Sequence, residues 1–207
     1  MSGSWDGFHA TKAGTGHVLR WPDELVVRIA SRWLRSGERP RLVLDMQCGG
    51  GRHSVLLASM GLDVVSLDVS RVALGQVRAA LAGSKLPAAM ASAHSSRLPF
   101  GHAAFDALVA WRSLHVFSRA EQPAVVAEMA RVVRASGRIL FSTRSDRNVY
   151  DATAVGRDLP RPTDLTFAQL EALCAPLDVL EIEHTETTAR NRSLRDAYWV
   201  VHARPRA

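Results

Sequence analysis

The sequence has few cysteines and no long apolar run. Its 207 residues include only two cysteines, Cys48 and Cys174, which lie far apart and form no C-x-x-C pair. The sequence therefore offers neither a disulfide framework nor a metal-binding pattern, and we expect reduced thiols and no metal. No stretch approaches the ~20 apolar residues of a membrane span, and M-S-G-S-W-D-G-F-H lacks the apolar core of a signal peptide. We therefore expect a cytoplasmic protein without a membrane partner.

Lysine and aromatic residues are also scarce. Lys12 and Lys85 are the only lysines among 26 basic residues, and aromatic residues make up 6% of the chain. The net charge of +6 would suit nucleic acid. However, the arginines are spread singly, and no basic helix with stacking aromatics is present, so we expect no nucleic-acid partner. The length and a composition that is 47% hydrophobic and 22% charged indicate a single globular domain over residues 1–207.

Short apolar runs alternate with helical patterns over most of the chain. Near-continuous apolar runs predict strands at 41–46, 63–68, 87–92, 105–111 and 138–143. Helical periodicity and the helix-start signals in P-D-E-L predict helices at 22–35, 51–60, 71–82 and 119–134. Strands of this kind that alternate with helices indicate a parallel sheet with helices on both faces.

The C-terminal part departs from this alternation. Residues 145–162 are polar and include prolines, which predicts a loop, and Thr166 with Gln169 forms a capping box for the helix that follows. The strands expected at 177–186 and 196–204 are joined by a turn too short for a crossover helix, so they should pair antiparallel. The predicted fold class is α/β: a doubly wound, mostly parallel seven-stranded sheet with a C-terminal antiparallel hairpin.

A glycine cluster follows the first predicted strand. Asp45 ends that strand, and Gly49, Gly50 and Gly51 allow a tight turn and a close approach to a ligand at the start of a helix. Asp68 ends the second strand, where an acid can accept both hydroxyls of a ribose. Alone, the glycines are more often a tight turn, and the acid can equally serve a helix N-terminus. Together they predict nucleoside binding.

Several stretches carry a family resemblance. These stretches are V-L-D-M-Q-C-G-G-G-R-H, G-L-D-V-V-S-L-D-V-S, S-S-R-L-P-F, F-D-A-L-V-A-W-R-S-L-H and R-V-V-R-A-S-G-R-I-L-F-S. They resemble the seven-stranded class I S-adenosylmethionine-dependent methyltransferases, and the resemblance runs from about residue 22 to residue 205. It implies an enzyme that uses S-adenosylmethionine and releases S-adenosylhomocysteine. Because the sequence shows no added substrate domain, basic helix or stacking aromatics, we expect a small-molecule acceptor.

The resemblance also implies roles by position. It places the methionine part of the cofactor against Asp45 and the loop residues Gln47, Cys48, Gly49 and Gly51. It assigns the ribose hydroxyls to Asp68, and the adenine to Val69, His94 and Ser95. Ala110 and Trp111 would line the sulfonium and the substrate.

Two positions differ from the family pattern, since Gln47 replaces a glycine and His94 replaces an acid. Either backbone groups and Val69 hold the adenine, or cofactor binding is weakened or lost. The second reading gives a non-catalytic S-adenosylmethionine-binding or interaction protein. A nicotinamide oxidoreductase is a further alternative, because residues 49–54 read G-x-G-x-x-S. The predicted antiparallel hairpin argues against it.

Methyl transfer depends mainly on positioning, so few catalytic residues are expected. His115, just past the fourth predicted strand, is the best candidate for a general base; the alternative is a packing histidine. In small members of the family, segments such as 1–21 form an arm or lid over the active site. This places His17, Arg20 and Trp21 near a substrate. Tyr150, after the fifth predicted strand, is a further substrate candidate. The acceptor, the methylated atom and the oligomeric state are not predicted.

Overall fold

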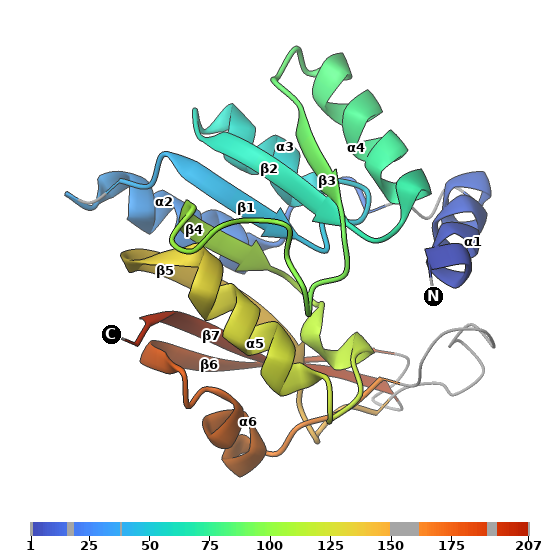
Figure 1. The fold of residues 1–207 in the computed structure, drawn as a ribbon. Helices are drawn as coiled ribbons and strands as arrows, with labels where there is room; N and C mark the ends of the chain where they lie inside the picture. Colours follow the sequence, from blue (N-terminus) through green and yellow to red (C-terminus); the bar gives the residue numbers. More distant parts are fainter. Residues whose placement is uncertain (1, 16–18, 38, 150–161, 190–193, 207) are drawn as a thin grey trace. The chain divides into compact units, whose positions relative to one another are not determined.

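The computed structural model describes residues 2–15, 19–37, 39–149, 162–189 and 194–206. Its strands form a seven-stranded sheet in the order β3-β2-β1-β4-β5-β7-β6 (Figure 1). The predicted fold class, a mostly parallel α/β sheet with a C-terminal antiparallel hairpin, is confirmed. The chain divides into two compact units. The first unit comprises residues 1–95 and 105–109, and the second comprises 96–104 and 110–207.

The first unit contains the parallel strands. Its elements are α1 (Ser2–Gly14), α2 (Glu24–Arg35), β1 (Leu42–Met46), α3 (Arg52–Ser59), β2 (Asp63–Asp68), α4 (Arg71–Gly83), β3 (Ala89–Ser92) and most of β4 (Phe105–Ala110). Strand β1 pairs in parallel with β2 and with β4, and β2 pairs in parallel with β3. Because the carboxyl ends of parallel strands share one edge, the loops after β1, β2 and β3 follow the same edge of the sheet.

Local signals explain where the helices of the first unit begin. The side chain of Asp23 accepts a hydrogen bond from the backbone N–H of Leu25 and caps α2, and Ser70 caps α4 in the same way through Ala73. Helix α2 buries Val26, Ile29, Ala30 and Trp33 on one face. The apolar periodicity therefore selects the buried face, and the polar caps fix the start of each helix.

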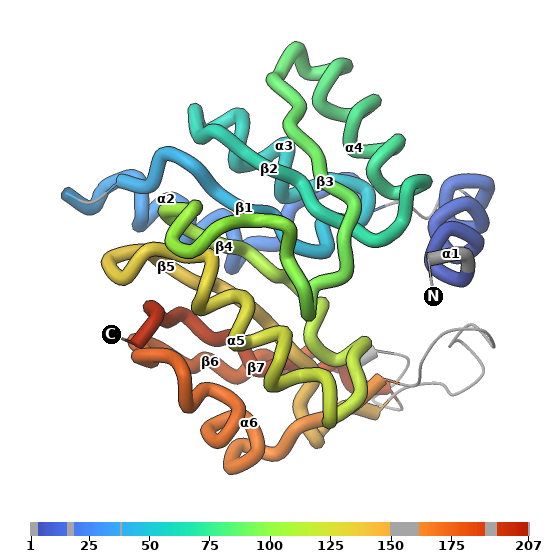
Figure 2. Tube along the Cα trace, in the orientation of Figure 1, coloured from blue at the N-terminus to red at the C-terminus, as the bar shows by residue number. Residues whose placement is uncertain are grey.

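The second unit is built around antiparallel strands. Its elements are the 3₁₀ helix η1 (Leu114–Val116), α5 (Gln122–Val132), β5 (Val133–Arg144), α6 (Phe167–Leu173), β6 (Leu177–Ala189) and β7 (Leu194–Pro205). Strand β7 lies between β5 and β6 and is antiparallel to both. Helix α5 contacts β5 and β7 (Figure 2). The predicted capping box of Thr166 and Gln169 is confirmed at the start of α6.

Several elements differ from the prediction. Helix α5 ends at Val132, and β5 begins at Val133, whose backbone is already extended. The residues Ala135, Ser136 and Gly137, expected to break the helix, therefore lie inside β5, because β-branched Val132 and Val133 favour an earlier change to strand. Strand β3 covers only Ala89–Ser92, and helix α1 was not predicted.

Candidate functional site

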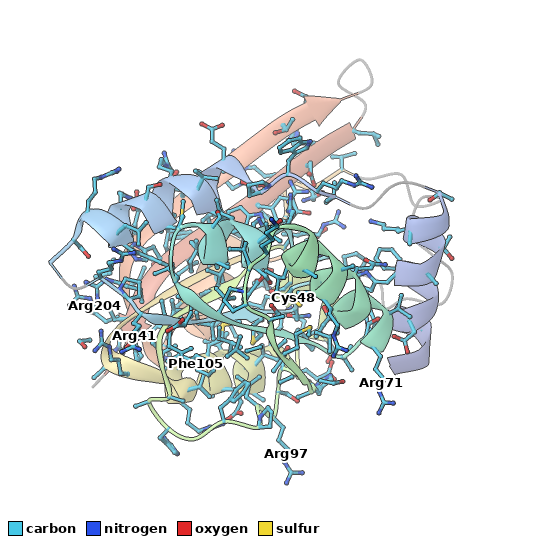
Figure 3. All side chains as sticks on the ribbon, turned by 90° about the horizontal axis from the view of Figure 1, so that it is seen from above. Arg41, Cys48, Arg71, Arg97, Phe105 and Arg204 are labelled. Carbon is cyan, nitrogen blue, oxygen red and sulfur yellow. The ribbon has the colours of Figure 1, made fainter. Side chains whose placement is uncertain are left out.

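The loop after β1 is a tight turn with three residues in the left-handed region. These residues are Gln47 at φ +57°, Gly49 at φ +52° and Gly51 at φ +84°. The backbone N–H of Cys48 donates to the carbonyl of Leu67 in β2 at 3.0 Å, which ties the loop to the neighbouring strand. Figure 3 labels Cys48 in this loop and Arg71 at the start of α4. The strand, the tight loop and helix α3 thus follow one another as the sequence predicted.

Gly51 is required by close packing as well as by its backbone angles. A Cβ atom at Gly51 would lie 3.0 Å from Cγ2 of Val77 and 3.2 Å from its Cα and Cβ, which belong to α4. Real Cβ atoms rarely approach other atoms so closely, so only glycine allows the loop to reach this position. Packing against α4 therefore fixes the position of the loop independently of any ligand.

Asp68 connects this loop to the loop after β2. Its Oδ2 atom accepts a hydrogen bond from the N–H of Gly49 at 3.0 Å, and its Oδ1 atom accepts one from the N–H of Ser70 at 2.9 Å. The residue is only 6% exposed. A carboxylate offers about four acceptor positions, so two remain for hydroxyl groups of a ligand. Asp68 can therefore both shape the loop and bind a polyhydroxylated molecule.

Asp45 lies in a buried chain of hydrogen bonds. The hydroxyl of Ser54 donates to Asp45 Oδ2 at 2.5 Å, and the hydroxyl of Ser66 donates to Ser54 Oγ at 2.8 Å. Burial, with a smaller contribution from the charge of Asp68, raises the pKa of Asp45 to about 7, although the Ser54 hydrogen bond opposes this shift. At neutral pH the side chain is therefore close to its point of ionisation. A cationic ligand group nearby would favour the ionised form.

The raised pKa predicts a pH-dependent stability. The pKa of Asp45 is about 7 in the folded state against an ordinary value of 3.8, so the folded state binds this proton more tightly. The corresponding stabilisation is complete below the ordinary value and is lost as the pH rises to the folded-state value. Asp45→Asn keeps an acceptor for Ser54 and does not titrate. We expect its free energy of unfolding to fall less over this pH range, by roughly 1.4 kcal/mol per pKa unit, or on the order of 4 kcal/mol.

Urea unfolding of the wild-type protein and the Asp45→Asn variant at a series of pH values measures this difference. Asp63→Asn is the matched control, because Asp63 occupies the opposite end of the neighbouring strand β2 and its side chain is 61% exposed. The control should follow the wild-type curve. Parallel curves for Asp45→Asn and the wild type would show that Asp45 has no raised pKa.

Helix α1 packs against α4 within the first unit (Figure 1). Asp6 Oδ1 accepts hydrogen bonds from the Ser70 hydroxyl at 2.6 Å and from the Val72 N–H at 3.2 Å. A Cβ atom on Gly49 would lie 3.6 Å from Cε1 of His9. Burial lowers the pKa of His9, and the charge of Asp68 opposes this shift. Asp6 and His9 are therefore site neighbours that the sequence analysis missed.

The spacing of α1 contains the signal that could have identified these residues. Trp5, Phe8, His9 and Lys12 recur at helical intervals. The Trp5 and Phe8 rings lie edge to face with centroids 5.7 Å apart, and Lys12 Nζ lies 4.5 Å from the centroid of Phe8. The glycines in this segment obscured the pattern because glycine disfavours helix.

The other candidate residues of the first unit lie after β2, after β3 and before α2. Val69 and His94 are half-buried, and Ser95 is buried in the turn after β3. Arg20 and Trp21 precede α2. The carbonyl of Trp21 accepts a hydrogen bond from Arg52 Nη1 at 3.1 Å, and Trp21 is 84% exposed. His17 and Tyr150 lie outside the described residues. The structure thus brings together Asp45, the loop from Gln47 to Gly51, and Asp68.

Ala110, Trp111 and His115 belong to the second unit. Ala110 ends β4 and is fully buried, as Trp111 nearly is. His115 lies in η1, and its carbonyl accepts a hydrogen bond from the Thr163 N–H at 2.8 Å. Burial, followed by the charges of Arg144 and Arg112, lowers the pKa of His115 to about 3. His115 is therefore neutral at physiological pH and a weak proton acceptor. Its role as a general base stays a prediction.

The described part of the chain shows no group of three or more His, Cys, Asp or Glu residues arranged to hold a metal ion. Both cysteines are free and buried, and burial raises the pKa of the Cys48 thiol well above its ordinary value. Among the helices in the described residues, none combines the length and the apolar character needed to cross a membrane.

Comparison with known proteins adds independent evidence. A family model described as a methyltransferase domain matches residues 43–137. The demethylmenaquinone methyltransferase of Mycobacterium tuberculosis (strain CDC 1551) is 39% identical over 180 residues, which cover 83% of this chain and 72% of that protein. The malonyl-[acyl-carrier protein] O-methyltransferase of Erwinia pyrifoliae is 31% identical over 133 residues, which cover 63% of this chain and 48% of that protein. The chain spans less than half the length of several curated relatives, between 43% and 49%.

A solved structure supports the fold. A chain from work on the conversion of a disulfide bond into a thioacetal group during echinomycin biosynthesis superposes with a TM-score of 0.78. It is 21% identical, and the match covers 99% of this chain and 93% of that chain. At this identity the likeness concerns the fold alone. Together, the matched domain, the extensive similarity to the mycobacterial enzyme and the shared fold show that the chain belongs to the class I S-adenosylmethionine-dependent methyltransferases.

Proposed function

We propose that this protein transfers a methyl group from S-adenosylmethionine to a small-molecule acceptor. The observation that carries the proposal is the position of Asp68, whose two carboxylate oxygens accept hydrogen bonds from the N–H groups of Gly49 and Ser70. This arrangement holds a buried carboxylate at the glycine-rich loop with acceptor capacity left for ribose hydroxyls.

The residues of the first unit fit the cofactor. Asp68 would take the ribose hydroxyls, and Val69 with His94 and Ser95 would hold the adenine. The methionine end carries positive charge, which suits the loop beside Asp45, a carboxyl group poised between its two charge states. Gln47 Oε1 is buried and has no hydrogen-bond partner among the described residues. Whether this side chain contacts the cofactor or turns away from it is tested by the Gln47→Gly variant below.

Methyl transfer requires the protein mainly to position the two reactants. Bound S-adenosylmethionine supplies a methyl group on a positively charged sulfur, which is a good leaving group. The chain must then hold cofactor and acceptor in line and exclude water. No catalytic triad is needed, which agrees with the absence of a strong base at His115.

A small-molecule acceptor is supported by the demethylmenaquinone methyltransferase, and less directly by the second relative, whose named acceptor is a small acyl group on a carrier protein. Their names state that one acts on demethylmenaquinone and another on malonyl-[acyl-carrier protein]. The two acceptors differ, so they support the general class and not one compound.

Incubation with methyl-labelled S-adenosylmethionine tests the proposal. Cell extract is separated into small-molecule, protein and RNA fractions, and each fraction is offered as acceptor. We expect label to enter the small-molecule fraction and S-adenosylhomocysteine to form at the same rate. Asp68→Ala, which should bind the cofactor more weakly, should show slower transfer when the cofactor is not saturating. Label in protein or RNA would contradict the small-molecule class. Cofactor binding without transfer to any fraction would favour a non-catalytic binding protein.

Gln47→Gly tests whether the unusual glutamine limits the site. Gln47 holds φ at +57°, where a side chain costs roughly 1–2 kcal/mol and glycine costs little. We expect the variant to raise the free energy of unfolding by about 1 kcal/mol and to preserve or tighten S-adenosylmethionine binding. Chemical unfolding and calorimetry measure the two quantities. Gln47→Asn, which tolerates the same backbone region, is the matched control. Loss of binding in both variants would show that the glutamine contacts the cofactor.

A further inference from the structure

A polar cluster surrounds His115 in the second unit. We call Arg112, His115, Arg144, Asp196 and Tyr198 the His115 cluster. The rings of His115 and Tyr198 lie edge to face with centroids 5.9 Å apart. Arg112 places its Cζ atom 4.4 Å from the Tyr198 centroid, and its Nη2 atom lies 2.9 Å from Asp196 Oδ2.

The strand register explains why these residues meet. Arg144 of β5 is directly opposite Tyr198 of β7 in the antiparallel ladder. Asp196 lies two residues before Tyr198, so all three side chains project from one face of the sheet. The backbone N–H of Arg112 donates to the hydroxyl of Ser142 at 2.7 Å, which anchors the segment after β4 to β5. The strand register and the anchored backbone of Arg112 therefore bring the cluster together, with the Arg112 and Asp196 side chains partly exposed at 38% and 45%.

His115 is buried, and one of its ring nitrogens lacks a hydrogen-bond partner among the described residues. The residue is 9% exposed, and the unpartnered atom is Nδ1. Buried polar atoms without partners are rare in folded proteins, and each one needs a cause. A ligand that supplies the missing partner is such a cause. The unpartnered Nδ1 therefore points to a bound group.

The charges around His115 indicate the kind of group. Burial and the guanidinium groups of Arg144 and Arg112 lower the pKa of His115. Arg112 is paired with Asp196, and Arg144 Nε lies 3.1 Å from Asp164 Oδ1. Burial raises the pKa of Tyr198, so the phenol is neutral. Burial is the largest cause of the lowered pKa of His115. The charges of Arg144 and Arg112 come next, and positive charge that disfavours an imidazolium favours an anion at the same place.

We propose that the His115 cluster binds the methyl acceptor through an oxyanion, either a carboxylate or an ionised phenolic or enolic hydroxyl. The oxyanion accepts a hydrogen bond from Nδ1–H of neutral His115 and lies in the field of Arg112 and Arg144. His115 follows the end of β4 by five residues, and ligands of α/β folds gather at the carboxyl ends of strands. The inference rests on the proposed function, since it assigns the cluster to the acceptor of that reaction.

Binding of matched probes tests the inference on the full chain with S-adenosylhomocysteine present. Benzoate and 4-nitrophenolate are the oxyanion probes, and benzamide and 4-nitroanisole are their uncharged counterparts. Imidazole nitrogen NMR follows the pKa of His115, with its signals assigned by their loss in His115→Asn. We expect the oxyanions to bind and to raise the pKa of His115 from about 3, and the uncharged counterparts to do neither. A preference between the two oxyanions distinguishes a carboxylate acceptor from a phenolic or enolic one.

Variants separate the hydrogen bond from packing. His115→Phe keeps a ring beside Tyr198 and should weaken oxyanion binding about tenfold, whereas His115→Asn, which keeps a donor near Nδ1, should restore part of it. Arg112→Gln should weaken binding of the oxyanions only. His184→Phe is the matched control, because His184 is a half-buried histidine of the same unit that is hydrogen-bonded to Ser145. It should leave probe binding unchanged.

Equal binding of charged and uncharged probes, no probe binding at all, or full binding by His115→Phe would overturn the inference. If His115→Phe fails to fold, the pKa of His115 in the unaltered protein decides alone, since an unchanged value on addition of the oxyanions would also overturn it. The proposed function fails differently. Transfer to an uncharged acceptor would leave it intact, whereas absence of S-adenosylhomocysteine binding would contradict it.

Discussion

Asp68→Ala should weaken the binding of S-adenosylmethionine by roughly 1–3 kcal/mol, or about 5- to 150-fold in Kd. The substitution removes the charged acceptor for the ribose. It also leaves the N–H groups of Gly49 and Ser70 without their carboxylate partner, so the loop loses one of the contacts that hold it. Calorimetric titration of the cofactor into the purified variant measures the change.

Two further variants assign the effect to the carboxylate. Asp68→Asn keeps one acceptor oxygen and the shape of the side chain, so its Kd should lie between those of the wild type and the alanine variant. Asp63→Ala, at the other end of the same strand with a side chain that is 61% exposed, should bind like the wild type. Circular dichroism checks that each variant is folded. A folded Asp68→Ala protein with unchanged affinity would remove Asp68 from the cofactor site.

Gly51→Ala should lower the free energy of unfolding by about 2–5 kcal/mol. The backbone at Gly51 has φ +84°, which costs a non-glycine residue roughly 1–2 kcal/mol. The added Cβ would also meet Val77 Cγ2 at 3.0 Å, and overpacking of this kind costs about 1–3 kcal/mol. Because the loop must shift to relieve the contact, we also expect weaker cofactor binding. Urea unfolding measures the first effect.

The chain offers a matched control and a second-site test for this prediction. Gly75 lies in α4 with open space around its Cβ position, so Gly75→Ala should stabilise the protein by about 1 kcal/mol. Adding Val77→Ala to Gly51→Ala should recover the part of the packing loss that comes from Cγ2. The contacts with Cα and Cβ of residue 77 at 3.2 Å and the backbone strain remain, so the double-mutant cycle should be non-additive. Equal stability of Gly51→Ala and the wild type would show that the loop tolerates a side chain.

The parallel core of the first unit was readable from the sequence because strand and loop signals there agree. Strand β2 was predicted at its observed bounds, and β1 and β4 to within one residue at either end, since each is an apolar run between polar or glycine residues. The C-terminal hairpin followed from the short connection alone. Where signals conflict, the prediction failed: Val133 continues the helical spacing of α5, yet its backbone is already extended.

Helix α1 shows what local patterns cannot supply. Its glycines at positions 3 and 7 give it a weak intrinsic preference for helix. The structure holds it through contacts with residues far along the chain, such as the hydrogen bond from Ser70 to Asp6. Contacts across more than 60 residues leave no trace in a sequence window. This is why Asp6 and His9 were missed.

The sequence predicted which loops form the cofactor site, but not the hydrogen bonds within it. The spacing of Asp45, the glycines and Asp68 identified the right loops. It did not reveal that Asp45 is bound to Ser54 in a buried chain, or that both oxygens of Asp68 are already engaged by backbone N–H groups. Such details depend on which way side chains point at the edge of the sheet. The sequence pattern specifies only that they reach that edge.

A crystal structure of the protein with S-adenosylhomocysteine tests the central claim most directly. The account predicts the ribose hydroxyls within hydrogen-bond distance of Asp68, with the methionine end at the loop from Gln47 to Gly51. A ribose bound away from Asp68, or a Gln47 side chain that fills the place of the methionine end, would contradict it.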